Sequence, residues 1–121
     1  MASMRLIVYA LLLATGVPVY YARPAQTRTL PMLCYRECRN RVFREADGAE
    51  YLAETMYVVD AYAATAEGAA GLAEAASLKL GSAGFTRESS EDGMEYGACR
   101  ITMRFRALAG AGRAGSWPDG S

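Results

Sequence analysis

The stretch from Glu50 to Tyr62, EYLAETMYVVDAY, alternates along its whole length. Tyr57 and Val59 point to one side, while Met56 and Val58 point to the other. A period of two is typical of a β-strand, and apolar residues on both sides indicate a strand that is covered on one face and only partly wet on the other. Because a strand this long needs partners on both edges, we place it in the middle of a sheet.

The length of 121 residues and the mass of 13.0 kDa allow one hydrophobic core and no second one. We expect a single domain over residues 1–107. Residues 108–121 have no apolar period, and the segment AGAGRAGSWPDGS indicates a disordered tail. Trp117 in this tail is either incidental, which we favour, or a small docking anchor.

The segment Met4 to Thr15, MRLIVYALLLAT, has two interpretations. Arg5 before an apolar run and small residues up to Gly16 resemble a secretory signal peptide. The other interpretation, which we favour, is an amphipathic helix that starts near Ser3 and ends at Gly16. At helical spacing its buried face would consist of Leu6, Ile7, Ala10, Leu13 and Ala14.

The next part of the chain predicts two strands and two connections. Residues 17–22 form a short strand whose Pro18 requires an edge or a strand start. After a polar loop over residues 23–29, residues 30–38 alternate as a second strand, with Cys34 on one face and Tyr35 on the other. Residues 40–49 are charged and contain Asp47-Gly48, which indicates a connection with a turn.

After the long strand, Thr65 has the character of a helix N-cap. The predicted helix runs to about Leu80 and ends at Gly81 and Gly84. Its apolar positions repeat at helical spacing, and the expected buried set is Ala69, Leu72, Ala73, Ala76 and Leu80. Residues 85–107 then predict a hairpin with its turn at Asp92-Gly93. In the last strand we expect Cys99, Ile101, Met103 and Phe105 to face the core, and Arg100, Thr102, Arg104 and Arg106 to face away.

Charge is unevenly distributed along a chain whose net charge is zero. Residues 1–45 carry seven arginines against two acids, residues 46–99 carry two basic residues against ten acids, and residues 100–121 carry four arginines against one acid. This pattern indicates either solvated faces of mixed sign or complementary surfaces of subunits that meet head to tail. The candidate subunit or partner interface comprises Arg41, Arg44, Asp47, Arg100, Arg104 and Arg106. No basic run is interleaved with aromatic residues, so we expect no sequence-specific nucleic acid partner.

Three cysteines, Cys34, Cys38 and Cys99, and the lack of histidine limit the chemistry of the chain. An odd number of cysteines favours free thiols over a disulfide scaffold. The spacing also lacks the fourth ligand of a structural zinc site. Because no nucleophile motif or Gly-rich phosphate loop is present, we expect no catalytic residue, no cofactor, no metal and no enzymatic activity. The apolar segments are too short to span a bilayer, so we expect no membrane partner.

The order of several short motifs resembles a known family. The motifs are Ala14-Thr15-Gly16, Val17-Pro18-Val19-Tyr20-Tyr21, Leu30-Pro31-x-x-x-Tyr35-Arg36, Ala46-Asp47, Val58-Val59-Asp60-x-Tyr62, Leu80-Gly81-Ser82-Ala83-Gly84-Phe85 and Glu88-x-x-Glu91-Asp92. Over residues 4–106 the chain is similar to the small tail-completion or tail-terminator proteins of tailed phages and prophages, which are also described as minor structural or head-tail joining proteins.

The elements predicted along the chain are two helices and about five strands in the order α-β-β-β-α-β-β. The resemblance implies an α+β fold in which a mostly antiparallel sheet has its helices packed on one face. It also implies a homo-oligomeric ring, possibly a hexamer, that caps the tail tube and joins it to the head. The partners would be other copies of the chain, the tail tube protein and the head-tail connector proteins. Such a protein would be made in the bacterial host cytoplasm and would end in the tail or neck of the virion.

The alternative is a small secreted, host-interacting protein. In that case residues 1–16 are a cleaved signal peptide, and Cys34 or Cys38 pairs with Cys99.

Overall fold

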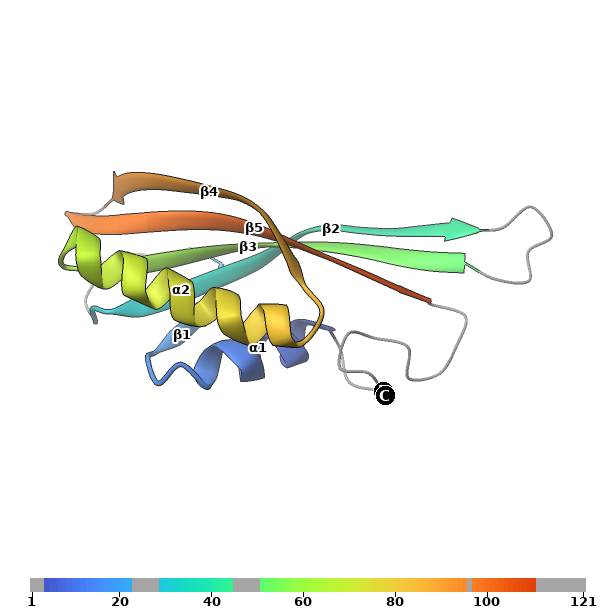
Figure 1. Cartoon of the computed structure of the whole chain (residues 1–121), viewed down its shortest axis with the longest axis horizontal. Coiled ribbons are helices and arrows are strands. Elements are labelled where there is room, and N and C mark those ends of the chain that lie inside the picture. The colour runs from blue at the N-terminus through green and yellow to red at the C-terminus, as the bar shows by residue number, and fades with distance from the viewer. Residues whose placement is uncertain (1–3, 23–28, 45–50, 96, 111–121) are drawn as a thin grey trace.

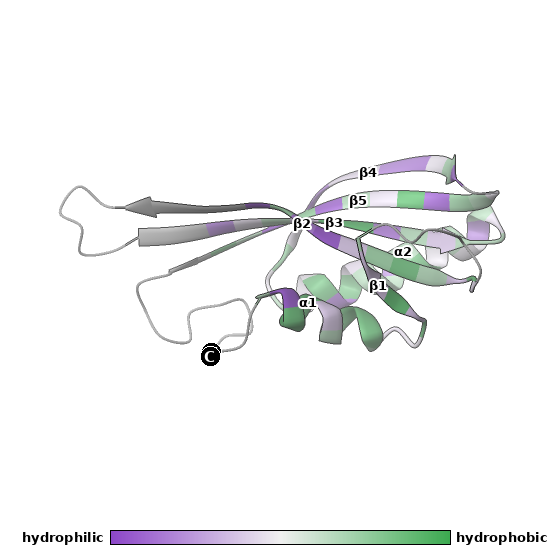
Figure 2. Ribbon diagram, turned by 180° about the vertical axis from the view of Figure 1, so that it is seen from behind, coloured by the Kyte–Doolittle hydropathy of each residue, from purple (hydrophilic) through white to green (hydrophobic). Residues whose placement is uncertain are grey.

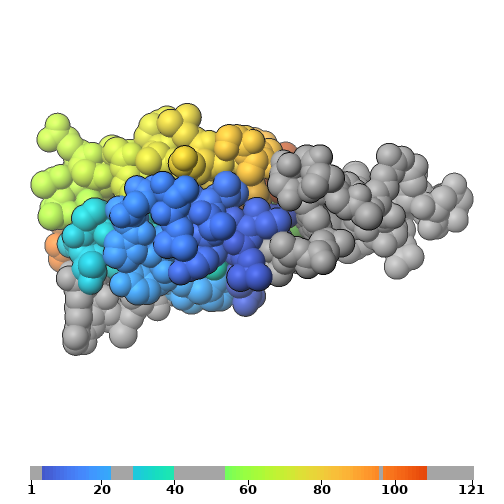
Figure 3. Space-filling model, turned by 90° about the horizontal axis from the view of Figure 1, so that it is seen from below, coloured from blue at the N-terminus to red at the C-terminus, as the bar shows by residue number. Residues whose placement is uncertain are grey.

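The computed structural model describes residues 4–22, 29–44, 51–95 and 97–110. Its elements are α1 (Met4–Leu13), β1 (Val19–Tyr21), β2 (Met32–Arg44), β3 (Tyr51–Ala63), α2 (Ala66–Ser82), β4 (Thr86–Glu95) and β5 (Ala98–Gly110). The strands form one open sheet in the order β1-β2-β3-β5-β4, in which only the β1–β2 pair is parallel. The two helices pack side by side on the same face of the sheet (Figures 1 and 3). This is the α+β fold and the element order expected from the sequence.

Strand β3 lies in the middle of the sheet, as its alternation predicted. Val59 faces Tyr35 of β2 on one side and Met103 of β5 on the other. Tyr57 and Val59 are fully buried beneath the helices, and Val58 is buried on the opposite face. Strand β3 therefore pairs with both β2 and β5 and contributes to the packing on both faces of the sheet.

Helix α2 follows its prediction closely. The Thr65 Oγ1 atom accepts the Gly68 N–H at 3.0 Å, which is the N-cap bond. The buried residues are the expected set of Ala69, Leu72, Ala73, Ala76 and Leu80. At the far end the Phe85 N–H donates to the Leu80 carbonyl at 3.0 Å, and Gly84 takes a φ of 98°. Small residues on the buried face let the helix approach the sheet closely.

Helix α1 forms, but it buries a different face from the predicted one. The buried residues are Met4, Val8 and Leu12, spaced four apart. Leu6 and Leu13 are exposed, and of the predicted face only Ile7 packs against the core. The prediction failed because, apart from Arg5 and Tyr9, the helix is apolar, so spacing alone could not choose between two apolar stripes. The helix is followed by Gly16, whose φ of 91° turns the chain toward β1, as expected.

Strand β1 is an edge strand that begins directly after Pro18, as the proline required. The Leu33 N–H donates to the Pro18 carbonyl at 2.9 Å. Strand β2, however, does not end at Cys38: it continues to Arg44, so the expected connection over residues 40–49 is wrong for its first part. Pairing with the long strand β3 overrides the weak strand propensity of this charged segment. Asp47 lies outside the described residues.

The predicted hairpin turn at Asp92-Gly93 is also wrong. Both residues lie within β4, where Gly93 pairs with Arg100, and the connection to β5 contains Gly97 with a φ of 78°. A Cβ atom on Gly93 would lie 2.2 Å from Nη2 of Arg100, so this glycine makes room for a side chain and does not form a turn. Strand β5 continues to Gly110, beyond the expected start of the tail at residue 108. Residues 111–121, including Trp117, lie outside the described residues.

Candidate functional site

The face of the sheet opposite the helices, here called the open face, carries most of the charged side chains of the sheet. The register places Cys34 of β2 opposite Asp60 of β3, and Asp60 opposite Thr102 of β5. Most residues of β4 are hydrophilic, and hydrophilic and hydrophobic residues alternate along β5 (Figure 2). Val58 is buried on this face because its two cross-strand neighbours are the long side chains of Arg36 and Arg104.

A row of charges crosses the open face from β2 to β4. Arg39 Nη1 lies 3.5 Å from Oε1 of Glu54, whose Oε2 lies 3.9 Å from Arg106 Nη1. Arg106 Nε in turn lies 2.7 Å from Oε2 of Glu88. The Glu54 side chain is only 10% exposed and therefore needs its cationic neighbours. The row ties four strands together at one level of the sheet.

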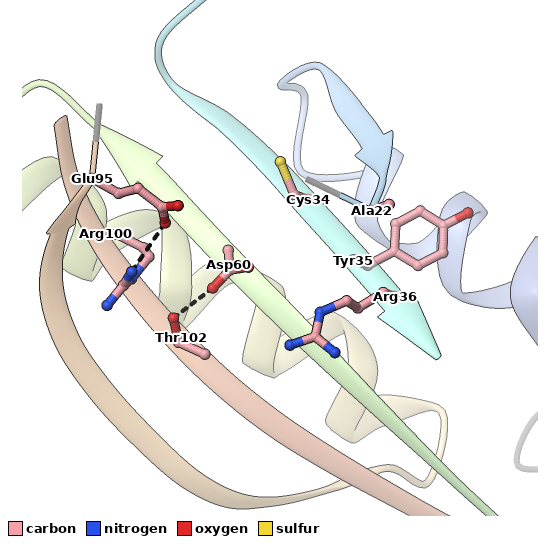
Figure 4. Close-up of a pocket in the computed structure, with 8 residues that line it drawn as sticks. All are labelled: Ala22, Cys34, Tyr35, Arg36, Asp60, Glu95, Arg100 and Thr102. Carbon is pink, nitrogen blue, oxygen red and sulfur yellow. Dashed lines mark hydrogen bonds and ion pairs between the residues drawn. The ribbon is translucent and has the colours of Figure 1, made fainter. Parts of the chain in front are cut away.

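A small pocket lies on the same face toward the other end of the strands (Figure 4). Its lining consists of Ala22, Cys34, Tyr35, Arg36, Asp60, Glu95, Arg100 and Thr102. Glu95 Oε1 accepts hydrogen bonds from Tyr62 Oη and Arg100 Nη1, each at 3.0 Å. The Thr102 hydroxyl donates to Oδ1 of Asp60. Arg36 reaches over the sheet from β2, next to this network (Figure 4).

The electrostatics of the pocket favour a structural polar network. Burial, with smaller contributions from Asp60 and Glu95, raises the pKa of the Cys34 thiol to about 12. Since the thiolate is the reactive form, Cys34 is a poor nucleophile at neutral pH. The hydrogen bond to Glu95 raises the pKa of Arg100, so this guanidinium keeps its charge and its partner.

The small volume of the pocket also favours a structural role for its polar network. Its volume is about 140 Å³, whereas sites for small-molecule ligands usually measure roughly 300–1,000 Å³. It has room for a few ordered water molecules between the polar side chains. The described residues contain no group of three or more Cys, Asp or Glu side chains placed to hold a metal ion.

The predicted interface residues differ in their surroundings in the structure. Arg100 and Arg106 lie on the open face, as predicted, and each is bound to an acid of its own chain. Arg104 lies between them on β5 and is exposed, with no ion pair to the described residues. The backbone of β2 pairs Arg41 with Glu54 and Arg44 with Tyr51, but the side chains of both arginines, like all of Asp47, lie outside the described part of the chain.

Sequence reasoning missed the network around Asp60 and Glu95. The available signal was Asp60 itself, an acid between the apolar pairs Val58-Val59 and Ala61-Tyr62 of the central strand. Such a residue requires polar neighbours on the adjacent strands. Finding Thr102 as its partner would have required the β3–β5 register, which the misplaced hairpin turn obscured.

Comparison with protein-family models and with curated proteins finds no relative. No protein-family model matches the chain, and no curated protein is significantly similar to it. Neither of the two described helices has the length and apolar character needed to cross a membrane.

Proposed function

We propose that the chain is a structural subunit of a tailed phage or prophage virion, a tail-terminator or tail-completion protein without catalytic activity. Copies of it assemble into a closed ring that caps the tail tube and joins it to the head-tail connector. The observation that supports the proposal is the fold, because both helices lie on one face of a mostly antiparallel sheet, which is the α+β arrangement that the family resemblance implies.

Two further features support an assembling subunit. The paired ends of β2 and β3 extend beyond both helices (Figure 1), so this arm is placed to reach a neighbouring subunit or the tube protein. The open face carries the exposed Arg104 beside the charge row, and charged surfaces fix the register between subunits.

The competing interpretation as a secreted protein has less support. Val8 and Leu12 of α1 have no exposed surface and belong to the main core, where a cleaved signal peptide would leave a gap. Cys34, Cys38 and Cys99 are all free thiols, whereas the secreted form would pair two of them.

Native mass spectrometry of the full chain purified from a bacterial cytoplasm tests the proposal. We expect one discrete closed oligomer with three free thiols per subunit, and ring-shaped particles in electron micrographs. The ring added to the polymerising tail tube protein of the same phage or prophage should stop tube growth. A chain that remains monomeric at every concentration, or rings that leave tube growth unchanged, would contradict the proposal.

A further inference from the structure

Among the described residues, the sheet has two long edges that lack a neighbouring strand. On one side it ends at β4. On the other side β1 pairs only with Leu33 to Tyr35, so β2 has no strand beside it from Arg36 onward within the described residues. The Tyr21 hydroxyl, which accepts the Glu37 N–H at 3.4 Å, lies at the start of this stretch. We call residues 86–95 the β4 edge and residues 36–44 the β2 edge.

The two edges carry opposite charge. The β4 edge has four acids against Arg87, a net charge of −3, and the β2 edge has four arginines against Glu37, a net charge of +3. Some of these charges are exposed and have no ion pair to the described residues, namely Arg36 on β2 and Glu91 and Asp92 on β4. The charges are therefore available to a partner.

Charge selects one way of pairing the edges. Unpaired backbone groups make each edge a template for an additional strand. Two β4 edges would bring acids together, and two β2 edges would bring arginines together, and like charges across a strand pair are destabilising. Opposite charges meet only when a β4 edge pairs with a β2 edge. Each edge also has one bulge, at Glu88 in β4 and at Cys38 in β2, and bulges hinder pairing with unrelated strands.

We propose that the β4 edge of one subunit pairs with the β2 edge of a second copy, so that the sheet continues from subunit to subunit. Strands β2 and β5 run in one direction and β3 and β4 in the other. A neighbour related by rotation about an axis along the strands therefore presents its β2 antiparallel to β4. The same head-to-tail contact repeats at every interface, and such a contact closes into a ring when the rotation closes. This inference rests on the proposed ring and specifies its interface.

Complementary charge reversals test the pairing. The first variant, Glu91→Lys with Asp92→Lys, makes both edges basic, and the second, Arg36→Glu with Arg44→Glu, makes both acidic. We expect each variant alone to stay monomeric. An equal mixture should form rings that contain the two variants in equal numbers, because each edge then meets its opposite. A chain with all four substitutions should assemble alone.

A control variant and a second measurement distinguish the loss of edge pairing from a general effect of the changed net charge. Glu67→Lys with Glu74→Lys changes the net charge as much as the first variant, at exposed positions of α2, and should assemble like the wild type. Cys38 lies exposed on the β2 edge, so we expect its alkylation to slow at least tenfold on ring formation, with the monomeric first variant as reference.

The outcomes distinguish this inference from the proposed function. Wild-type rings that survive both charge reversals, or that leave Cys38 alkylation unchanged, would overturn the edge pairing and leave the ring standing. A wild-type chain that forms no closed oligomer would contradict the ring and this interface together.

Discussion

The Tyr57 hydroxyl donates a 2.9 Å hydrogen bond to Oε1 of Glu37, the residue directly opposite it on β2. The ring of Tyr57 is fully buried between those of Tyr35 and Phe85, with ring centroids 6.4 and 6.3 Å away, whereas Glu37 is half-buried. The bond therefore links the aromatic core to the rim of the sheet. It also satisfies a hydroxyl that has no access to water.

Removal of this hydroxyl should weaken the fold. We expect Tyr57→Phe to lower the free energy of unfolding by about 1.5 kcal/mol, since the acceptor is charged. Burial and the bond to Glu37 raise the pKa of Tyr57 above its ordinary value. The wild type should therefore lose stability above about pH 10, where the unfolded tyrosine ionises first, and the variant should lose less. Urea unfolding at several pH values measures both effects. Tyr20→Phe, at an exposed position, is the control and should leave stability unchanged.

Two threonines on neighbouring strands should respond in opposite ways to the same substitution. The Thr55 hydroxyl is fully buried and has no hydrogen-bond partner among the described residues, whereas the Thr102 hydroxyl donates to Asp60. We expect Thr55→Val to stabilise the protein by about 1 kcal/mol, and Thr102→Val to destabilise it by about 1.5 kcal/mol. Thermal unfolding of the pair measures the difference. A loss of stability in Thr55→Val would mean that its hydroxyl has a partner.

Two glycines in α2 provide a second matched pair. A Cβ atom on Gly71 would meet no atom within 4 Å, while on Gly68 it would lie 3.1 Å from Oγ1 of Thr65 and 3.2 Å from Cβ of Ala63. Gly71→Ala should therefore stabilise the protein by about 0.8 kcal/mol through helix propensity. Gly68→Ala should gain less or nothing, because it crowds the N-cap. Equal gains in chemical denaturation would show that the N-cap adapts freely.

The three thiols should differ in reactivity. Cys38 is exposed and should be alkylated first, while Cys34, which is buried and has its pKa raised to about 12, should react only on unfolding. Mass analysis of alkylated peptides at pH 8 gives the order. The raised pKa also means that Cys34 contributes stability that is complete below about pH 8.5 and is lost as the pH rises toward 12. In Cys34→Ala this part of the alkaline decline should be absent.

The sequence predicted the elements whose patterns have a single interpretation. The alternation of β3 and the spacing of the small residues in α2 each fit one structure only, and both predictions are confirmed. Apart from Arg5 and Tyr9, helix α1 is apolar, so its buried face depended on packing against Tyr35 and α2, which no local pattern encodes. The far half of β2 has a composition typical of a loop, and its pairing with β3 outweighs that local preference.

The site was less predictable because it depends on register. The arginines of β5 could be placed on one face from alternation alone. That Arg100 pairs with Glu95 and Arg106 with Glu88 depends on where β4 turns into β5. The sequence Asp92-Gly93 is typical of a turn, yet Gly93 lies beneath the Arg100 guanidinium, a requirement that appears only in three dimensions.

Because β3 lies in the centre of the sheet, one of its edges stays unpaired until late in synthesis. One edge of β3 pairs with β2, which precedes it in the chain, but its other edge pairs with β5, the last of the described strands. Until Met103 and Phe105 have left the ribosome, Tyr57 and Val59 lack half of their cross-strand neighbours. Between the synthesis of β3 and that of β5 the nascent chain therefore carries an unfinished sheet in which one edge of β3 is unpaired, and unpaired strand edges favour aggregation and chaperone binding.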